Sequence, residues 1–571
     1  MAGRRLRIGG ICLAVALASA APAAAQEGPC PGRAIKPDRV ITGEFGTKLA
    51  ESFVMLPFHV PRRTTAIRVK YCFDRPESGT SSHTLDLGLY EPRRGRSRLW
   101  SVDEFRGWGG SSHPDVTVSA EGFSTKAQYT ASPRIEPPGK TMRAFLPGRI
   151  RPGRWAVELG VAAVIPRSEG DADGKVAWRV EIKLSDDREF ADATYRPARY
   201  DRRPAAPEPG WYAGDMHVHA EHSAYGDATM TEVFGYAFSP LAEGGAGLDF
   251  ITLSDYVSGS AWGEIGRHQR LYPGKLIIRS DEVITYRGHA NNHASARFVD
   301  YREGPIYERA TDGSLRRLRG DRDPRELFRE IHRLGGWTQI NHPTIFPPVN
   351  PAAAAFCRGC FWEYSDEETG LSELDAYEIA TGPSEFGSAP NPFTVTAIAE
   401  YERLLGLGHR IAAVGSSDSH NAGRTTSILQ APIGTATTVV RAPELSERGI
   451  ECGVRARRTY VKVSGNGGPD LRFTARPRDG SGTAIVGDVI RADGARFEAR
   501  VRGGAGRELL VVKDGATVAR VPVASDRFTH RFDGTGRGRW RLQLMRGALI
   551  DTVSSPIWVE PGRGTVKRSR C

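Results

Sequence analysis

The sequence predicts a multidomain protein in which a central α/β domain lies between two β-rich domains. The chain has 571 residues, which is too long for one hydrophobic core and favours two to four domains. Apolar segments with a period of two come first and last, and in the middle they alternate with segments of helical period. The mean hydropathy of −0.39 is that of an ordinary globular protein.

The first residues have the pattern of a secretory signal peptide. Residues 1–7 carry three arginines, an apolar run follows at 8–21, and three alanines at 23–25 precede Gln26. The apolar run is shorter than the roughly 20 residues that a membrane helix needs, and no later stretch approaches that length. We therefore expect a signal peptide over residues 1–25 and a secreted or periplasmic protein without a membrane span.

Residues 26–205 are predicted to form a β-sandwich-like domain. Segments such as 66–73, 84–90 and 177–184 alternate apolar and polar residues and are bounded by Gly, Pro, Ser and Asp. Many such strands without helices favour a sandwich. A stretch rich in Pro and Arg, residues 196–210, separates this domain from the next.

The central domain, residues 206–465, alternates strand-like and helix-like segments. The stretches 324–336 and 391–408 have apolar spacing near 3.6 and end in glycine, which predicts helices. Strands that alternate with helices indicate a parallel sheet or barrel. Residues 466–571 return to strands without helices, and Asp514–Gly515 between two alternating runs predicts a hairpin turn in this small C-terminal β domain.

The cysteine content agrees with export. Six cysteines remain once the one in the signal peptide is removed, and an even number in an exported protein favours disulfides. We favour the pairs Cys30–Cys72 and Cys452–Cys571, because each pair joins segments in adjacent or common domains.

The remaining two of the six cysteines, Cys357 and Cys360, form a CxxC motif. Such a motif can hold zinc or act in redox chemistry, but one CxxC without a second pair favours a local disulfide in an oxidising compartment.

The formal charge of +11 suits an anionic substrate or surface. The basic residues are nevertheless spread along the chain, with no dense basic run interleaved with aromatic residues. A solvated basic surface is the simpler interpretation, and we do not expect nucleic-acid binding. The sequence does not indicate an oligomeric state.

Histidines are concentrated in the central domain, where ten of the 14 lie between His217 and His420. The first two, His217 and His219, are two residues apart after an apolar lead-in. On a strand, residues i and i+2 face the same way, so both rings can reach one ion. An isolated pair of this kind is more often solvated or packed in a core.

Three further apolar runs end in side chains that ligate metals. One run ends at Glu282 and is followed seven residues later by His289, a second ends at His342, and a third ends in Asp418-x-His420. Functional groups of α/β barrels collect at the carboxyl ends of the strands. We therefore expect these side chains to meet at one site.

These motifs, in the order HxH, E…GH, NHP and SDSH, resemble those of the PHP (polymerase and histidinol phosphatase) domain over residues 211–464. The resemblance implies a distorted (β/α)7-type barrel that holds two or three transition-metal ions. Two further elements, RRTYV at 457–461 and SSPIWV at 554–559, resemble the "GRTYVT" and "SNPIYV" elements of the exported carbaryl-hydrolase-like branch.

The resemblance implies eight metal ligands: His217, His219, Asp227, Glu282, His289, His342, Asp418 and His420. The HxH pair and Asp418 would hold one ion. Glu282 would bridge to a second ion, which the next two histidines complete. His420 would belong to a third site together with Asp227.

The second motif departs from the pattern of the family. Where the family usually has Ser-Asp-His, this chain has Ser-Asp-Tyr256. A two-metal site and a third ion held with Tyr256 therefore both remain open. His222 is an alternative to Asp227. His268 and His293 are further substitutes if loops bring them in, although a surface or supporting role is the simpler interpretation of each.

Mixed imidazole and carboxylate ligands suit Zn, Mn or Fe, and such ions lower the pKa of bound water towards about 7. We therefore predict a metal-dependent hydrolase of small, possibly anionic esters, and a phosphoesterase first of all. Glu282, Asp418, Tyr256 and Arg424 are its candidate catalytic residues. A carboxyl-ester, carbamate or amide hydrolase with the same centre is one alternative. A non-catalytic binding module on a degenerate barrel is another alternative. Purified protein that holds and takes up no transition metal would favour this module over either hydrolase.

Overall fold

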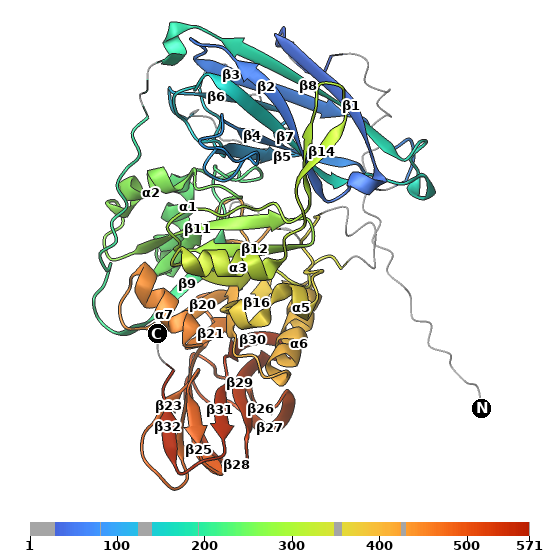
Figure 1. Cartoon of the computed structure of the whole chain (residues 1–571). Helices are drawn as coiled ribbons and strands as arrows, with labels where there is room; N and C mark the ends of the chain where they lie inside the picture. Colours follow the sequence, from blue (N-terminus) through green and yellow to red (C-terminus); the bar gives the residue numbers. More distant parts are fainter. Residues whose placement is uncertain are drawn as a thin grey trace, which may run out of the picture.

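The structure is a computed structural model that describes residues 29–569 apart from short segments. Those segments are residues 33, 80, 124–139, 192, 194, 348–356 and 424–429. Strands predominate over helices, and Figure 1 shows three parts stacked in chain order, from blue through green and yellow to red. The predicted signal peptide, residues 1–25, lies outside the described residues.

Two sheets face each other in the first part of the chain. One sheet has the order β1 (Arg39–Gly46), β8 (Lys175–Ser185), β3 (Ala66–Phe73) and β6 (Asp115–Ser119). The other has the order β14 (Leu315–Arg319), β13 (Ile306–Arg309), β2 (Ser52–Val60), β7 (Gly153–Ala163), β4 (Thr84–Tyr90) and β5 (Phe105–Gly110). Apolar side chains from both sheets form one shared core, as in a sandwich.

This first part is not separate from the middle of the chain. The hairpin β13–β14 comes from the central region, yet β13 pairs in parallel with β2, with Tyr307 opposite Val54. Just before this hairpin, the fully buried Arg302 bonds to Glu158 of β7 at 3.1 Å and to the carbonyl of Trp100 at 2.7 Å. The domain limits at residues 205 and 465 stay a prediction. Backbone pairing between β13 and β2 joins segments on the two sides of the limit at 205.

The central sheet carries the parallel strands. They are β9 (Gly210–Val218), β10 (Phe250–Leu253), β11 (Leu276–Thr285), β15 (Trp337–Ile340), β16 (Ala376–Thr381) and β19 (Ala412–Ser416). The antiparallel strands are β12 (Gly288–His293), β20 (Thr437–Ala442) and β21 (Thr459–Lys462). The helices are α1 (Met230–Phe238), α2 (Trp262–Gln269), α3 (Pro324–Arg333), α5 (Asp366–Thr369), α6 (Pro392–Gly406) and α7 (Glu447–Arg455). A short hairpin, β17 (Glu385–Phe386) and β18 (Ala389–Pro390), precedes α6.

The two predicted helices begin where local chemistry places them. In α3 the side chain of Asp323 accepts from the backbone N–H of Glu326, and Pro324 occupies the first turn. In α6 Asn391 caps the backbone N–H of Phe393 in the same way. A capping acceptor followed by proline satisfies a free N–H group and fixes the first helical turn. Both helices are confirmed, with ends two or three residues inside the predicted limits.

The central sheet curls, but it does not show the predicted (β/α)7 barrel. Strand β19 contacts β9, and Val218 bridges to Ser419, so the two sides of the sheet approach each other. Strand β12, however, follows β11 through a turn at residues 286–287 and runs antiparallel. A tight hairpin leaves no room for a crossover helix, and parallel strands require one. The central sheet is therefore a curled sheet of mixed parallel and antiparallel strands.

The last part of the chain is made only of strands. They are β22 (Asp470–Pro477), β23 (Ala484–Ile485), β24 (Val489–Arg491), β25 (Gly494–Arg502), β26 (Glu508–Lys513), β27 (Ala516–Pro522), β28 (Arg527–Thr535), β29 (Gly538–Arg546), β30 (Leu549–Ser554), β31 (Ile557–Glu560) and β32 (Thr565–Lys567). The predicted hairpin is confirmed: Asp514 and Gly515 join β26 to β27, with φ of +50° and +85°. Pairing of β21 with β30 makes this part continuous with the central sheet.

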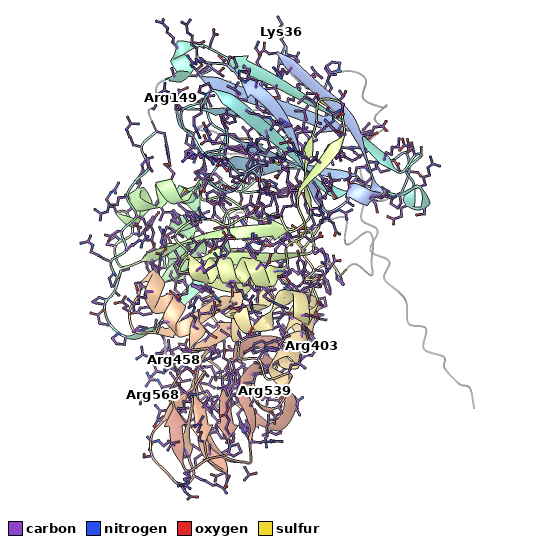
Figure 2. All side chains as sticks on the ribbon, in the orientation of Figure 1. Lys36, Arg149, Arg403, Arg458, Arg539 and Arg568 are labelled. Atoms are coloured by element: carbon purple, nitrogen blue, oxygen red, sulfur yellow. A yellow bond between two sulfur atoms is a disulfide. The ribbon has the colours of Figure 1, made fainter. Side chains whose placement is uncertain are left out.

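Basic side chains are dispersed over the whole molecule. Figure 2 labels Lys36 and Arg149 in the first part of the chain, and Arg403, Arg458, Arg539 and Arg568 in the middle and last parts. Many arginines pair with nearby carboxylates, as Arg403 does with Asp366 at 2.7 Å. Among the described residues no helix has both the length and the apolar character that a bilayer crossing requires.

Candidate metal centre

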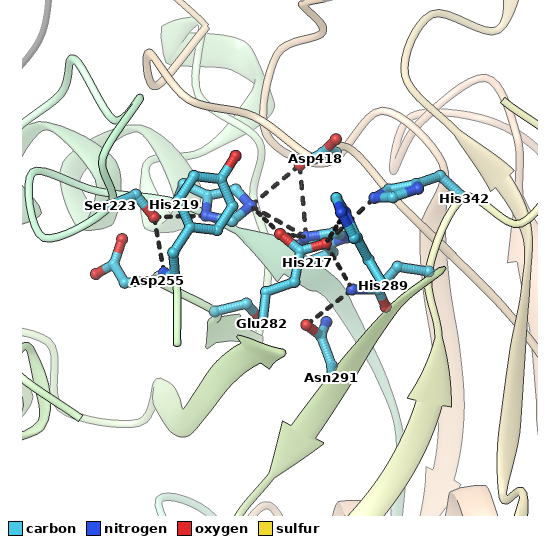
Figure 3. A network of polar contacts seen from close by, with 12 residues as sticks. His217, His219, Ser223, Asp255, Glu282, His289, Asn291, His342 and Asp418 are labelled. Atoms are coloured by element: carbon cyan, nitrogen blue, oxygen red, sulfur yellow. Dashed lines mark hydrogen bonds and ion pairs between the residues drawn. The ribbon is translucent and has the colours of Figure 1, made fainter. Parts of the chain in front are cut away.

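Six of the eight expected ligands converge at one end of the curled sheet (Figure 3). They come from the end of β9, from β11 and β12, and from the residues that follow β15 and β19: His217, His219, Glu282, His289, His342 and Asp418. All but Asp418 are buried. Ligand atoms of His217, His219 and Asp418 form one compact group, and those of His217, Glu282 and His342 form another.

The first half of the site surrounds the HxH pair. Nε2 of His219 lies 3.1 Å from Oδ1 of Asp418, and Nε2 of His217 lies 3.4 Å from the same oxygen. The other side of the pair faces Oε2 of Glu282, at 3.3 Å from His217 and 3.4 Å from His219. Two imidazole nitrogens and two carboxylate oxygens therefore point at one small space.

The second half of the site lies on the other side of the same carboxylate. Oε1 of Glu282 is 3.3 Å from Nδ1 of His289 and 3.2 Å from Nε2 of His342. Asn341 also donates to this oxygen, at 3.0 Å. Each oxygen of Glu282 thus faces its own pair of histidines, which is the arrangement by which a carboxylate bridges two ions.

The ring nitrogens that face Glu282 in the second half-site are the ones free to bind a cation. A backbone carbonyl can only accept, so Nε2 of His289 donates to the Arg358 carbonyl at 3.0 Å and Nδ1 of His342 donates to the Cys360 carbonyl at 3.0 Å. In the neutral rings the lone pairs then lie on Nδ1 of His289 and Nε2 of His342, facing a carboxylate oxygen. A proton or a metal ion must separate such groups.

The pKa values respond to this crowding. Burial by itself raises the pKa of Glu282, but His217 and the other imidazoles hold it well below its usual range. Burial by itself lowers the pKa of His342, but Glu282 raises it to about 9. The pKa of His219 falls to about 3, because the ring is buried and His420 lies beside it. The lowered pKa of Glu282 and the raised pKa of His342 both mean that positive charge between these side chains is stabilised.

The chemistry of the donors fits divalent transition metals. Oδ1 of Asp418 is buried and has no hydrogen-bond partner among the described residues, although it lies beside two imidazoles. A buried carboxylate oxygen without a donor is costly unless a cation satisfies it. Histidine nitrogen and carboxylate oxygen together suit Zn, Mn or Fe.

The backbone is strained at two of these positions. His342 has φ of +28° and Asp418 has φ of +52°, which residues with a Cβ rarely adopt. Asp418 is held by its N–H, which donates to the His217 carbonyl at 3.0 Å, and His342 by its N–H, which donates to Glu378. Such strain persists only where surrounding contacts enforce it, and it gathers at functional sites.

Two buried carboxylates that sequence reasoning missed organise the site. Asp215 accepts from the backbone N–H groups of His217, Ser417 and Gly434, at 3.2, 3.1 and 2.8 Å. Glu378 of β16 accepts from the backbone of His342, and its Oε1 lies 3.8 Å from Nδ1 of His217. The available signal was an acidic residue inside an otherwise apolar strand, because such a group needs buried donors.

The structure places His420 in a hydrogen-bond chain, with its ring stacked on that of His219 at a centroid distance of 4.1 Å. Its Nδ1 donates to the Asp418 carbonyl at 2.9 Å, so its Nε2 accepts from the Tyr256 hydroxyl at 2.6 Å. The backbone N–H of Asp227 donates to the His420 carbonyl at 2.8 Å. Neither His420 nor Asp227 belongs to a candidate metal group of the described residues.

The remaining candidates lie apart from this centre or outside the described residues. Nδ1 of His222 pairs with Ser260 at 3.1 Å, and its Nε2 lies 3.3 Å from the guanidinium of Arg143, which disfavours a cation there. His293 stacks on Trp337 with ring centroids 3.9 Å apart. His268 packs against the ring of Phe234. Arg424 lies outside the described residues.

A pocket of about 550 Å³ opens onto the site. Its lining includes Glu282, His289, His342, Asp418 and His420. The first part of the chain contributes Thr84, Asp86, Trp108, Ser111 and Ala162. The central part contributes Phe346, Cys357 and Arg358 from loops, Phe386 from β17 and Phe393 from α6. The N-terminal sheets thus help to shape the space in front of the candidate ligands.

Two of the predicted disulfides are confirmed. Cys30 bonds to Cys72, and Cys357 bonds to Cys360. The sulfur of Cys360 lies near the ligand atoms of His289 and His342, but in the disulfide it is not a free thiolate ligand. The predicted Cys452–Cys571 pair lies outside the described residues because Cys571 is not among them.

Comparisons with known proteins are sparse. No protein-family model and no curated protein matches the chain. Among solved structures it is similar to a two-domain protein from Bacteroides vulgatus ATCC 8482, described as containing a predicted PHP-like metal-dependent phosphoesterase. The identity is 17% and the TM-score 0.33, over 66% of this chain and 100% of the other. A likeness this distant does not establish the family, and it says nothing about the carbaryl-hydrolase-like branch.

Proposed function

We propose that this protein is a metal-dependent hydrolase with two divalent transition-metal ions, and that it acts first of all on phosphoesters. The observation that carries the proposal is the position of Glu282, whose two oxygens each face two histidine nitrogens at 3.2–3.4 Å. His217, His219 and Asp418 would hold one ion, and His289 and His342 the other. A third ion is not part of the proposal, because both ring nitrogens of His420 have partners within the protein.

The proposed ions would supply the chemistry, and Tyr256 and Trp108 would shape the site around them. Bound ions lower the pKa of water towards about 7 and polarise the oxygen of an ester. Tyr256 lies against the pocket, and its burial raises the pKa of its hydroxyl well above 10, so the group stays protonated and holds His420 in place. Trp108 packs edge-on against Tyr256 and also lines the pocket.

An anionic substrate is favoured by Arg358. Arg358 is one of the residues that line the pocket. Burial lowers the pKa of this arginine, although acidic neighbours such as Glu51 and Asp86 oppose the shift. An arginine in a pocket beside a metal centre is suited to a phosphate or carboxylate oxygen.

Hydrolysis of a carboxyl ester, carbamate or amide is the second candidate. The observation that favours it is the aromatic part of the pocket wall, which includes Trp108, Tyr225, Phe346, Phe386 and Phe393. Flat apolar walls suit an aromatic leaving group, whose burial stabilises the complex without any charge on the substrate. We further propose that the chain is exported, in keeping with the two disulfides among its described residues and the signal-peptide pattern at residues 1–25.

A substrate panel on metal-loaded protein tests the proposal. The panel is p-nitrophenyl phosphate, bis-p-nitrophenyl phosphate and a naphthyl carbamate, each with Mn, Zn and Fe. We expect His342→Ala to reduce kcat/KM at least about 100-fold on every substrate that the wild type hydrolyses, because the second ion loses a ligand. The control His59→Ala changes an exposed histidine of β2 and should retain full activity. Protein that takes up no transition metal would rule out both hydrolase candidates.

Arg358→Ala separates the two substrate classes. We expect KM for a phosphoester to rise about tenfold or more while KM for the neutral naphthyl carbamate changes less than twofold, because only the anion uses the guanidinium. Arg287→Ala is a matched control, since Arg287 is a half-buried arginine of the same region that pairs with Glu368. Equal effects of Arg358→Ala on both substrates would contradict its role in recognising a charge.

A further inference from the structure

The CxxC turn, residues 357–360, lies directly against the second half of the candidate metal centre. The carbonyl of Arg358 accepts from Nε2 of His289, and the carbonyl of Cys360 accepts from Nδ1 of His342, both at 3.0 Å. These are the two histidines whose other ring nitrogens face Oε1 of Glu282. One four-residue turn therefore contacts both histidine ligands of the second half-site.

From this geometry we infer that the disulfide-closed turn Cys357–Cys360 is a positioning device for the second metal ion. The inference rests on the proposed function. Each carbonyl holds the proton of its histidine on the nitrogen that points away from the site, which leaves the other nitrogen free for the metal. A metal-bound histidine commonly donates its second N–H to such an acceptor, and loss of the acceptor weakens metal binding about 10- to 100-fold.

The turn is built so that these two carbonyls have defined positions. The disulfide joins its first and last residues. After the turn, the backbone N–H of Trp362 donates to the Pro343 carbonyl at 3.0 Å, and Phe361 bridges to Thr344. The carbonyl of Cys360 is thus tied to the segment that follows His342, while the disulfide brings Arg358 back towards His289.

Gly359 is required by the same packing. Its φ of +78° is in the left-handed region, and a Cβ at this position would lie 2.9 Å from Nε2 of His289 and would also collide with the Thr285 carbonyl. Any larger residue must therefore displace the histidine or the turn. In the motif Cys-Arg-Gly-Cys the two cysteines close the turn and Gly359 permits its close approach to His289, while the backbone carbonyls of residues 358 and 360 are the two acceptors.

The test compares metal binding by full-length mature variants. Cys357→Ser/Cys360→Ser opens the turn. Both cysteines are replaced because a lone Cys360 thiol would lie near His289 and His342 and supply a ligand of its own. Gly359→Ala retains the disulfide and acts by displacement, so the test survives if the double variant does not fold. The control is Cys30→Ser/Cys72→Ser, which removes the disulfide that anchors the start of the chain to β3.

Metal-free proteins are titrated with Zn²⁺ and Mn²⁺ by calorimetry, and stoichiometry is measured after dialysis. We expect two ions in the wild type and the control. In the double variant and Gly359→Ala the first ion binds as in the wild type and the second binds 10- to 100-fold more weakly. A general loss of structure would weaken both ions, so selective loss of one ion distinguishes positioning from unfolding.

Two outcomes overturn the inference in different ways. If the double variant and the Gly359→Ala variant are both folded and both bind two ions with wild-type affinity, the positioning role is wrong while the proposed hydrolase stands. If the wild type itself binds no transition metal, the proposed function fails and the inference fails with it. Circular dichroism of each variant establishes that it is folded.

Discussion

Glu282→Gln is expected to abolish binding of both metal ions and to reduce kcat/KM at least about 1,000-fold. The amide keeps the size of the side chain but loses the charge, and its NH2 group would point a donor at one pair of histidine nitrogens. The two oxygens of Glu282 face one half-site each, so loss of the charge affects both ions. An effect of this size corresponds to about 4 kcal/mol of transition-state stabilisation. Elemental analysis of the dialysed protein and kinetics with p-nitrophenyl phosphate measure the two effects.

Glu243→Gln provides the matched control for this substitution. Glu243 is exposed, near the end of α1 and away from the pocket lining, so the same change of charge should leave metal content and kinetics unaltered. A Glu282→Gln protein that keeps both ions would contradict the bridging role of the carboxylate. Loss of one ion with retention of the other would show that Glu282 belongs to a single half-site.

Arg302→Met is expected to destabilise the protein by about 3–5 kcal/mol. The side chain is completely buried and forms ion pairs with Asp300 at 2.8 Å and with Glu158 at 3.1 Å. Methionine fills a similar volume but leaves the carboxylate of Glu158 buried without its cation, which costs several kcal/mol. The loss should appear in urea unfolding as a lower midpoint, first of all for separation of the N-terminal sheets from the centre, because Glu158 belongs to β7.

Arg329→Met is the control for a solvent-exposed pair. Arg329 pairs with Glu373 at 3.1 Å, and more than half of its side chain is exposed. Exposed pairs contribute about 0–1 kcal/mol because water screens them. Equal destabilisation by the two variants would show that burial of Arg302 does not dominate its effect. A loss of activity in Arg302→Met at temperatures where it stays folded would connect this contact to the pocket wall.

The convergence of the six candidate ligands could be predicted because it depends on local patterns. Apolar runs that end in His or Asp identify the ends of β15 and β19, and alternation identifies which side chains share a face. The same pattern was wrong for Glu282, which lies inside β11 and not at its end. The helix starts at Asp323 and Asn391 and the turn at Asp514 follow from equally local chemistry. These features require only neighbours in the sequence, so a single chain is enough to predict them.

Other features depend on contacts between distant segments. Periodicity predicts which face of a strand is apolar but not which strand it pairs with. The sequence therefore gave no sign that β13 would pair with β2, which lies about 250 residues earlier in the chain. The hydrogen bond between Tyr256 and His420 is of the same kind, because the two residues are far apart in the sequence. The antiparallel return of β12 likewise replaced an expected barrel unit by a hairpin.

From the sequence by itself we predict the types and the order of the candidate ligands and the local disulfide of the CxxC turn, but not that Glu282 lies inside β11 and His289 near the start of β12. Only the tertiary structure decided that Glu282 divides its two oxygens between two pairs of histidines, that the N-terminal sheets line the pocket, and that the carbonyls of the CxxC turn meet His289 and His342. The physical reason is that hydrogen bonds and ligand distances are set to tenths of an ångström by packing of segments far apart in the chain, whereas residue type and periodicity are local.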